Sequence, residues 1–413
     1  MNKTDLLIIG AGPGGYRAAE YAAKQGLQVV IAEQDEVGGT CLNRGCIPTK
    51  TYVHSATLAE GYERQQQVVA QLRAGVEGIL SAPNITLLRG HAEFISPSEC
   101  SVGSDIVAAN NIIIATGSSA KLLPLPDIDD PRLVTSTELL QMQTVPKRLC
   151  IIGAGVIGME FASIFQRYGS EVTVIEYLKE CLPMLDSDIA KRLRKVLEKR
   201  GITFKMKTAV QSLADIDADV ILMATGRKPN TDGLHLEKVG IKMATNGLPV
   251  DDNYQLSVEN CQLSIYAIGD VNGRQMLAHA AEMQAVRAVN HILGKQDGIR
   301  FDIMPSAIFT EPEAACVGPT EDMLKEKGTP YVCKKAFWRA NGKALAMNES
   351  EGMLKLLSDA DGRIIGCHAF GAHAADIVQE VAALMCRDTT IDQLRDMVHI
   401  HPTLGEILHS AVE

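Results

Sequence analysis

The sequence predicts an α/β protein that contains two similar strand–turn–helix–strand units. The first observation is a repeated motif: Gly-x-Gly-x-x-Gly occurs at Gly10 to Gly15 and again at Gly153 to Gly158, each time directly after a short apolar run. The second observation is length, because 413 residues correspond to two or three domains at roughly 150 residues per domain. Strands that alternate with helices in this way indicate a mainly parallel sheet.

The composition is typical of a globular protein and excludes several classes. Apolar residues make up 46% of the chain, and 40 Lys and Arg against 50 Asp and Glu give a formal charge of −10. Nucleic-acid binders normally carry a basic surplus. The longest apolar runs, such as residues 111–115, are strand-length and too short to span a bilayer. Residues 1–5 contain one Lys and no apolar h-region, so the sequence predicts no signal or transit peptide.

The first unit reads strand, glycine turn, helix and strand over residues 6–33. In Gly10, Gly12 and Gly15, the first glycine allows the tight turn, the second allows a pyrophosphate to approach, and the third allows close helix–strand packing. The amides at the helix N-terminus then face the phosphates. Glu33 ends the second strand, 23 residues after Gly10, where a carboxylate can bind ribose hydroxyls. The alternative is a glycine-rich turn without a ligand.

The second unit repeats this order from Leu149 to Glu176. The spacing from Gly153 to Glu176 is again 23 residues. Two such units predict two Rossmann-like dinucleotide-binding domains, and a flavin with a nicotinamide is the common pairing for hydride transfer. A carboxylate at Glu176 binds a free 2′-hydroxyl and repels a 2′-phosphate, so NAD is favoured over NADP. Lys179, which follows closely, is the one feature against NAD.

Three further strand ends carry small residues. They are Ala115-Thr116-Gly117, Ala224-Thr225-Gly226 and Gly269-Asp270. Each alone is more consistent with a tight turn than with a ligand contact. Together, around two glycine motifs, they favour cofactor contacts.

Two of the ten cysteines, Cys41 and Cys46, lie close together directly after the first unit. At a helix start, side chains four or five residues apart share one face, so a disulfide is plausible, and a helix N-terminus or a nearby cation lowers a thiol pKa. Two incidental core cysteines or half of a metal site are the alternatives; no Cys or His cluster nearby completes a zinc site, and we predict no metal. We interpret the pair as redox-active. The other cysteines are scattered singly, as in a reducing cytosol, and we expect them to be structural and the protein to be cytoplasmic: Cys100, Cys150, Cys181, Cys261, Cys316, Cys333, Cys367 and Cys386.

A candidate base lies near the C-terminus. His401 with Glu406 five residues later can form a pair in which the carboxylate orients the imidazole. His399 is a competitor, and a C-terminal His is often simply solvated. A dithiol substrate, however, needs a base to form its thiolate.

Together these motifs resemble the class I pyridine nucleotide-disulfide oxidoreductases, a family of flavoprotein disulfide reductases, and within it the dihydrolipoamide dehydrogenases. The resemblance runs from Asp5 to Ile407. It includes the redox motif at 38–50, the flavin-contacting helix start at 276–279, the opening of a dimerisation domain at 305–313 and the His-x-His-Pro motif at 399–402. It implies an FAD domain over 1–118 and 247–300, an NAD domain over 119–246, and an α+β C-terminal dimerisation domain over 301–413.

The resemblance also implies roles for single residues. Cys41 exchanges with substrate, Cys46 faces the flavin, and His401 with Glu406 deprotonates a dihydrolipoyl thiol of a lipoyl domain. Lys50 and Glu160 form an ion pair near the flavin; the alternative for each is an ordinary surface charge. A homodimer is implied, because the base serves the disulfide of the other subunit.

The cofactor contacts follow from the motifs and the resemblance together. The residues expected to hold FAD are Gly10, Gly12, Pro13, Gly14, Gly15, Glu33, Gln34, Gly39, Thr40, Lys50, Ala92, Ala115, Thr116, Gly117, Gly269, Asp270, Met276, Leu277, Ala278 and His279. Those expected to hold NAD are Gly153, Gly155, Val156, Ile157, Gly158, Glu176, Ala224, Gly226 and Arg227.

Other activities on the same fold are the alternatives. A mercuric reductase is expected to carry a vicinal Cys pair near its C-terminus, and this chain ends in residues 409–413 without one. A glutathione-type reductase is expected to prefer NADP, whereas Glu176 disfavours the 2′-phosphate of NADP. A non-catalytic flavoprotein would not need the two cysteines with His401 and Glu406. The chain is also shorter than the family between Lys50 and Ala115 and between Glu176 and Ala224, either as a compact member or because loops are missing from the sequence.

Overall fold

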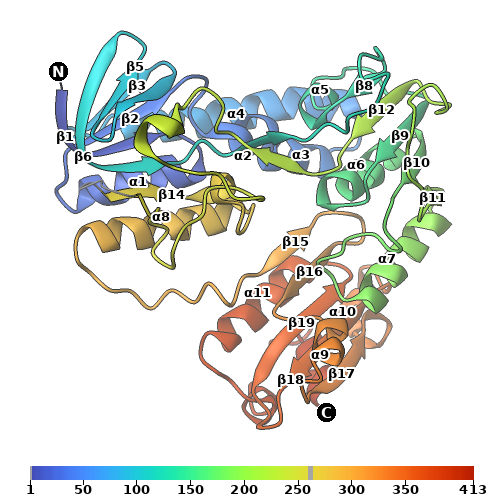
Figure 1. The fold of residues 1–413 in the computed structure, drawn as a ribbon. Helices are drawn as coiled ribbons and strands as arrows, with labels where there is room; N and C mark the ends of the chain where they lie inside the picture. The colour runs from blue at the N-terminus through green and yellow to red at the C-terminus, as the bar shows by residue number, and fades with distance from the viewer. Residues whose placement is uncertain (1, 259–263) are drawn as a thin grey trace. The chain divides into compact units, whose positions relative to one another are not determined.

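The computed structural model describes residues 2–258 and 264–413 (Figure 1). Cys261 lies outside the described residues. The chain divides into two compact units, and each unit joins two separate stretches of sequence. The first unit is Met1–Lys121 with Gly226–Ile299, and the second is Leu122–Thr225 with Arg300–Glu413.

A seven-stranded sheet organises the first unit (Figure 1). Its order is β3-β2-β1-β6-β5-β4, and β14 also pairs with β6. The long strand β6 pairs antiparallel with β5 near its start and parallel with β14 near its end. The strands are β1 (Asn2–Ile9), β2 (Val29–Glu33), β3 (Ile85–Arg89), β4 (Ala92–Ser96), β5 (Glu99–Val102), β6 (Asp105–Ile114) and β14 (Ser264–Ala267).

Two helices of this unit pack against each other, α1 (Pro13–Lys24) and α8 (Ala278–Ile292). Four buried alanines on α1 allow the close approach. The Tyr21 hydroxyl donates to the Asn290 side chain at 2.9 Å and ties the pair together. The remaining elements are α2 (Gly39–Arg44), α3 (Cys46–Val53), α4 (Leu58–Leu80), the β7 (Ser118–Ala120) and β13 (Arg227–Pro229) pair, and the 3-10 turns η1 (Leu236–Val239) and η2 (Gly269–Asn272).

The second unit contains two sheets. The first is parallel throughout, in the order β11-β10-β9-β12-β8. Most residues of helix α6 are apolar, and the helix is buried from Gly158 to Phe165. The elements are β8 (Leu133–Val134), α5 (Ser136–Leu139), β9 (Arg148–Ile152), α6 (Val156–Arg167), β10 (Glu171–Ile175), α7 (Ser187–Lys199), β11 (Thr203–Lys205) and β12 (Val220–Met223).

The other sheet of this unit is antiparallel, in the order β15-β16-β19-β18-β17. Its core centres on Trp338, whose indole N–H donates to the Ala372 carbonyl at 3.1 Å. The elements are β15 (Ser306–Ile308), β16 (Ala314–Val317), α9 (Glu321–Glu326), β17 (Val332–Phe337), η3 (Trp338–Ala340), α10 (Gly342–Ala346), β18 (Met353–Ser358), β19 (Ile364–Phe370), α11 (Ala374–Met385), α12 (Ile391–Arg395) and α13 (Ile407–Val412).

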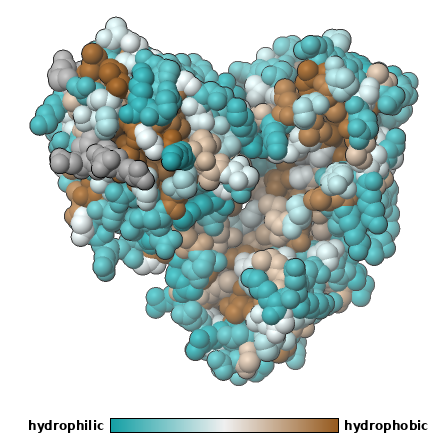
Figure 2. All heavy atoms as spheres, in the orientation of Figure 1, coloured by the Kyte–Doolittle hydropathy of each residue, from teal (hydrophilic) through white to brown (hydrophobic). Residues whose placement is uncertain are grey.

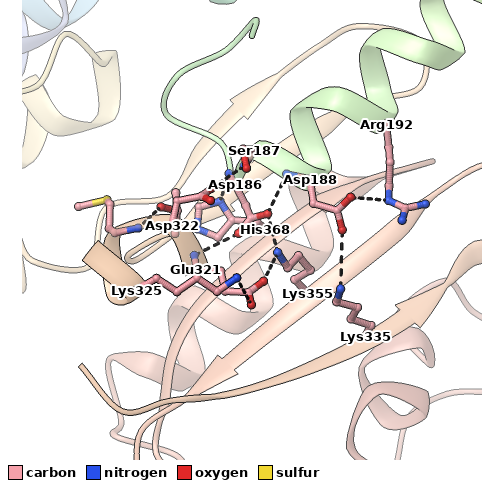
Figure 3. A network of polar contacts seen from close by, with 12 residues as sticks. Asp186, Ser187, Asp188, Arg192, Glu321, Asp322, Lys325, Lys335, Lys355 and His368 are labelled. Atoms are coloured by element: carbon pink, nitrogen blue, oxygen red, sulfur yellow. Dashed lines mark hydrogen bonds and ion pairs between the residues drawn. The ribbon is translucent and has the colours of Figure 1, made fainter. Parts of the chain in front are cut away.

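A buried polar network joins α7 to this antiparallel sheet (Figure 3). The Lys355 ammonium contacts Asp186 at 2.6 Å and Glu321 at 2.5 Å. Burial lowers the pKa of Lys355, but its two carboxylate partners outweigh that effect and raise it above the ordinary value. The His368 ring accepts from the Asp186 backbone N–H and contacts the Pro319 carbonyl, so it is neutral with its proton on Nε2. The network fixes the start of α7.

These sheets confirm the predicted fold class: two Rossmann-like domains with parallel strands and a C-terminal α+β domain. The predicted strands over residues 6–9, 29–33, 149–152, 172–175 and 220–223 are all present. Figure 2 shows mainly hydrophilic side chains on the visible face, with apolar side chains in separate patches. Among the described residues, no helix combines the length and the apolar character needed to cross a membrane.

Candidate active site

The two glycine turns have nearly the same geometry. A Cβ at Gly10 would lie 2.5 Å from the Ala115 carbonyl oxygen, and one at Gly153 would lie 2.5 Å from the Ala224 carbonyl oxygen. The third glycines are tighter still, because a Cβ there would lie 1.8 Å from the Gly10 oxygen or 2.0 Å from the Gly153 oxygen. The predicted small residues at strand ends 115–117 and 224–226 therefore form the wall against which each turn packs.

Each turn is closed by its predicted glutamate. Glu33 accepts the Ala11 N–H at 2.7 Å and the Asp35 N–H at 2.9 Å. Glu176 accepts the Ala154 N–H at 2.6 Å and the Leu178 N–H at 2.7 Å. The carboxylate thus ties the end of the second strand to the residue after the first glycine.

The space over each turn fits a dinucleotide pyrophosphate. A Cβ at Gly155 would meet no atom of the described residues within 4 Å, and one at Gly12 would meet only the Gly39 Cα at 3.9 Å. Gly12 and Gly155 are also the residues that precede α1 and α6, so neither supplies a side chain to cap its helix. Backbone amides at an uncapped helix start are ready donors for phosphate oxygens.

The redox motif lies on two short helices. Cys41 is in α2 and Cys46 begins α3, with Gly45 between them. The prediction that one helix start carries both cysteines was therefore wrong. The chain turns sharply because Gly45 approaches closely: a Cβ there would lie 2.9 Å from the Thr40 carbonyl oxygen. This turn still brings the two thiols together.

The two thiols are chemically unequal. The pKa of Cys41 is raised far above its ordinary value, first by its hydrogen bond with Cys46, then by burial and by the charge on Cys46. The positive charge of Lys50, one turn further along α3, acts in the opposite direction. Of the two thiols, that of Cys46 is the more exposed.

Asn43 holds the redox motif in shape and was not among the predicted site residues. Its side-chain amide donates to the carbonyls of Val37 at 3.0 Å and Gly39 at 2.9 Å. Its oxygen accepts from Arg73 of α4 at 2.8 Å. The signal was an Asn two residues after Cys41 in a turn-rich segment, but its partner on α4 is 30 residues away.

Asp270 lies in a second polar cluster of the first unit. Its carboxylate accepts from the Ser118 hydroxyl and lies 3.6 Å from the Arg227 guanidinium. Arg227 also donates to the Ser118 oxygen Oγ at 2.6 Å. Arg227, predicted as an NAD ligand, thus belongs to the first unit together with Asp270, and Ser118 was not predicted. Burial lowers the pKa of Arg227.

The other predicted FAD residues of this unit take clear positions. Thr116 and Asn230 exchange hydrogen bonds at 2.6 and 3.0 Å, which fixes the strand end at 115–117. Gln34 lies 2.8 Å from the His91 ring. Residues 276–279 form the start of α8, at which Leu277 precedes the helix and Ala278 begins it. Ala92 is buried.

The predicted contact between His401 and Glu406 is present in the second unit. Nδ1 of His401 lies 2.9 Å from the Glu406 carboxylate, and His401 is 80% exposed. The Thr403 N–H donates to Glu406 at 2.8 Å. The pKa of Glu406 is lowered, first by this backbone bond and then by His401. An ionised Glu406 therefore holds His401 with its other ring nitrogen, Nε2, free of that bond.

Glu160 is buried on α6 of the second unit, and its carboxylate accepts the Phe309 N–H at 2.9 Å. Lys50 belongs to the first unit. Within residues 2–258 and 264–413, no group of three or more His, Cys, Asp or Glu side chains is placed to hold a metal ion.

Two family profiles match this chain. The pyridine nucleotide-disulphide oxidoreductase profile matches residues 4–285, and the dimerisation domain of the same family matches residues 304–412. The fold and the paired cysteines define a flavoprotein disulfide oxidoreductase. The chain belongs to the class I pyridine nucleotide-disulphide oxidoreductases, an enzyme family whose members bind FAD and NAD(P).

Curated relatives cover nearly the whole chain. It is 35% identical to the mitochondrial dihydrolipoyl dehydrogenase of Pisum sativum, over 99% of the chain and 91% of the relative. It is 34% identical to dihydrolipoyl dehydrogenase 3 of Haloarcula marismortui, over 99% of the chain and 96% of that relative. It is 35% identical to leghemoglobin reductase of Glycine max, over 99% and 87%.

Solved structures show the same fold. A Cu(II) complex of the HOCl-induced flavoprotein disulfide reductase RclA from Escherichia coli superposes with a TM-score of 0.93, at 30% identity, over 100% of this chain and 99% of that one. LpdA from Mycobacterium tuberculosis superposes with a TM-score of 0.90, at 25% identity, over 100% of this chain and 99% of LpdA.

The relatives contain residues that this chain lacks. The alignment with the Pisum sativum protein runs over 459 positions, although the chain has 413 residues. The chain is shorter than the family between Lys50 and Ala115 and between Glu176 and Ala224, and the backbone is hydrogen-bonded in both of these stretches. Helix α4 runs through Gly61 without interruption, and Ile216 donates to the Leu213 carbonyl at 3.1 Å.

Proposed function

We propose that the protein oxidises protein-bound dihydrolipoamide to lipoamide and reduces NAD⁺ to NADH. The observation that carries this proposal is the contact between the unequal thiols of Cys41 and Cys46 at the junction of α2 and α3. A disulfide at this position is the natural acceptor for a dithiol. The names of the relatives that are 34–36% identical support the dihydrolipoyl substrate.

The chain's own residues divide the reaction between them. In the oxidised enzyme the two sulfurs share one bond. His401, held by Glu406, takes a proton from a substrate thiol through its free ring nitrogen. The substrate thiolate attacks Cys41 and breaks the Cys41–Cys46 bond, and the second substrate thiolate then displaces Cys41. The substrate leaves as a cyclic disulfide, and its two electrons remain on the cysteine pair.

The electron pair leaves through the cofactors. A bound FAD supplies the chemistry that accepts two electrons from the dithiol and gives them, with a proton, to NAD⁺ as hydride. We propose that FAD is held by the turn Gly10 to Gly15 with Glu33, by Asp270 and by the start of α8. We propose that NAD is held by the turn Gly153 to Gly158 with Glu176. Cys46, the more exposed of the two thiols, is proposed to face the flavin.

The dimerisation domain suggests a homodimer. We propose that the base of one subunit serves the disulfide of its partner and that Lys50 and Glu160 pair. We also propose three functional domains: FAD over 1–118 and 247–300, NAD over 119–246, and the interface over 301–413. The compact units differ from this division, since residues 226–246 cluster with the first unit.

An anaerobic titration of the holoprotein with dihydrolipoamide tests the function. We expect a long-wavelength thiolate–flavin absorbance band after two-electron reduction, and NADH formation when NAD⁺ is added. Cys41→Ser and Cys46→Ser should each lower NADH formation at least 1000-fold, on the order of 4 kcal/mol. Cys386→Ser, at an exposed thiol far along the sequence, is the matched control. Wild-type protein that gains no band and forms no NADH would disprove the proposal.

A second candidate is a reductase like RclA, favoured by the superposition over the whole chain. In that case NADH is the electron donor, and one NADH reduces one disulfide to two thiols, since the solved structure is that of a disulfide reductase. NADH oxidation with a disulfide that is not lipoamide is the comparison measurement. A rate with that disulfide above the rate of dihydrolipoamide oxidation favours this second candidate.

A further inference from the structure

The segment that carries His401 runs from Met397 to Pro402 between α12 and α13 and contains no helix or strand. Its apolar side chains face outward, since Val398 is 98% exposed and Ile400 is 79% exposed. The His399 side chain, between them, is only 10% exposed. The imidazole of His399 therefore points into the unit, while that of His401 points to solvent.

His399 is fixed by groups from two helices. Its Nε2 lies 3.2 Å from the Glu380 carboxylate of α11. Its ring packs edge-on against the His409 ring of α13, with centroids 6.4 Å apart. The titratable groups around it are Glu380, Glu406, and His409 with its partner Glu413.

The other ring nitrogen identifies the tautomer. Nδ1 of His399 is buried and has no hydrogen-bond partner among the described residues. A buried N–H without a partner costs more than a buried lone pair next to a carboxylate. Nε2 of His399 is therefore the ring nitrogen that donates, and its partner is Glu380.

A second anchor holds the far side of the same segment. The Asn341 side chain donates to the Thr403 carbonyl at 3.1 Å, and the Thr403 hydroxyl donates to the Ile400 carbonyl at 2.7 Å. Thr403 also donates its N–H to Glu406. His401 thus lies between the anchor at His399 and the anchor at Thr403.

We propose that His399, pinned to Glu380, is a positioning residue that holds His401 against Glu406. This inference rests on the proposed function, in which His401 is the base. Without the hydrogen bond between His399 and Glu380, residues 397–402 become more mobile and the His401–Glu406 contact loosens. A small misplacement of a catalytic group lowers rates strongly. A looser contact also stabilises the imidazolium form of His401 less.

The test compares three variants of the holoenzyme. His399→Leu removes the hydrogen bond and keeps an apolar side chain of similar reach. His399→Gln can still donate to Glu380 and should rescue part of the function. His373→Asn is the matched control, because His373 also contacts a carboxylate at 3.2 Å, that of Asp376, at the other end of α11.

Three readouts separate positioning from folding. NAD⁺ reduction by dihydrolipoamide uses His401, whereas reduction of an artificial dye by NADH does not use the base. The third readout is the pH dependence of His401 carbethoxylation by diethyl pyrocarbonate, followed by peptide mass spectrometry, which reports its pKa without any turnover.

We expect His399→Leu to lower the dithiol reaction about tenfold, with dye reduction within twofold of wild type. The pH profile of His401 carbethoxylation should differ from that of the wild type. His399→Gln should lie between, and His373→Asn should match wild type. A His399→Leu enzyme with unchanged His401 titration, or with equal losses in both reactions, overturns the inference. If the wild type does not oxidise dihydrolipoamide, the proposed function fails, and the His401 titration alone still decides this inference.

Discussion

The two glycine turns are alike in their backbone and differ in what covers them. At the first turn, the redox motif lies over the middle glycine: a Cβ at Gly39 would approach the Gly12 Cα to 2.7 Å. At the second turn, a Cβ at Gly155 would meet no atom of the described residues within 4 Å. The closing glutamates differ in the same sense, since Glu33 is buried and Glu176 is half-buried.

In the proposed function, this difference corresponds to two kinds of ligand. A turn that is packed against the redox motif suits a cofactor that stays in place beside Cys41 and Cys46. An open turn suits a coenzyme that enters and leaves in each cycle. One local motif can therefore serve retention or exchange, depending on its tertiary surroundings.

The largest expected effect comes from the third glycines. In Gly15→Ala the new Cβ would lie 1.8 Å from a backbone oxygen that cannot move away, so we expect protein without bound flavin. In Gly158→Ala the corresponding distance is 2.0 Å, and we expect flavin to be retained while NADH binding is lost. The flavin-to-protein absorbance ratio and an NADH titration measure both. Loss of flavin from Gly158→Ala would show that the two turns are not independent.

The next effect tests the open turn. Gly155→Ala adds a methyl group where the pyrophosphate is expected, so the Kd for NADH should rise about 10- to 100-fold, or about 1.4–2.8 kcal/mol. The free energy of unfolding should change by less than about 1 kcal/mol, because the new group meets no neighbour. An unfolding change larger than the binding change would mean that this space is part of the folded core.

A smaller effect tests the covered turn. Gly39 has φ +60° and contacts Gly12, whereas Gly26 has φ +92° and a Cβ added there would meet no described atom within 4 Å. Gly26→Ala therefore isolates the backbone strain and serves as the control. Gly39→Ala should cost about 1–3 kcal/mol more than this control in chemical denaturation. Equal costs would indicate that the motif does not depend on the contact with the first turn.

The smallest effect concerns the closing glutamates. In Glu33→Gln one of two backbone N–H donors faces an amide NH₂ in a buried place, which should cost about 1–3 kcal/mol of unfolding free energy. In Glu176→Gln one of the two corresponding donors likewise faces an amide NH₂, but at a more exposed position, so the change should cost about 1 kcal/mol or less. Denaturant titrations of both variants measure the difference, and the reverse order would contradict the burial argument.

Much of the fold was predictable because its signals are local. Glycines spaced within one turn, apolar runs before them and a carboxylate 23 residues later predicted both units. The His401–Glu406 contact was also predicted, because both residues lie in one short segment. The break between α2 and α3 was not, since it depends on how closely Gly45 approaches Thr40.

Residues whose partners are distant in sequence were missed. Asn43 bonds to Arg73 across 30 residues, and Lys355 bonds to Asp186 across 169. The position of Asn43 near Cys41 was a weak signal, but the partner of each residue could not be predicted, because only folding brings the two halves of the contact together.

The sequence by itself determined the two glycine turns, the cysteine pair and the imidazole–carboxylate pair, because each is a pattern of neighbours along the chain. Only the tertiary structure decided which turn is covered, which thiol is the more exposed and which histidine is buried. Those properties depend on burial and on charges brought from other elements, and a linear pattern does not contain them.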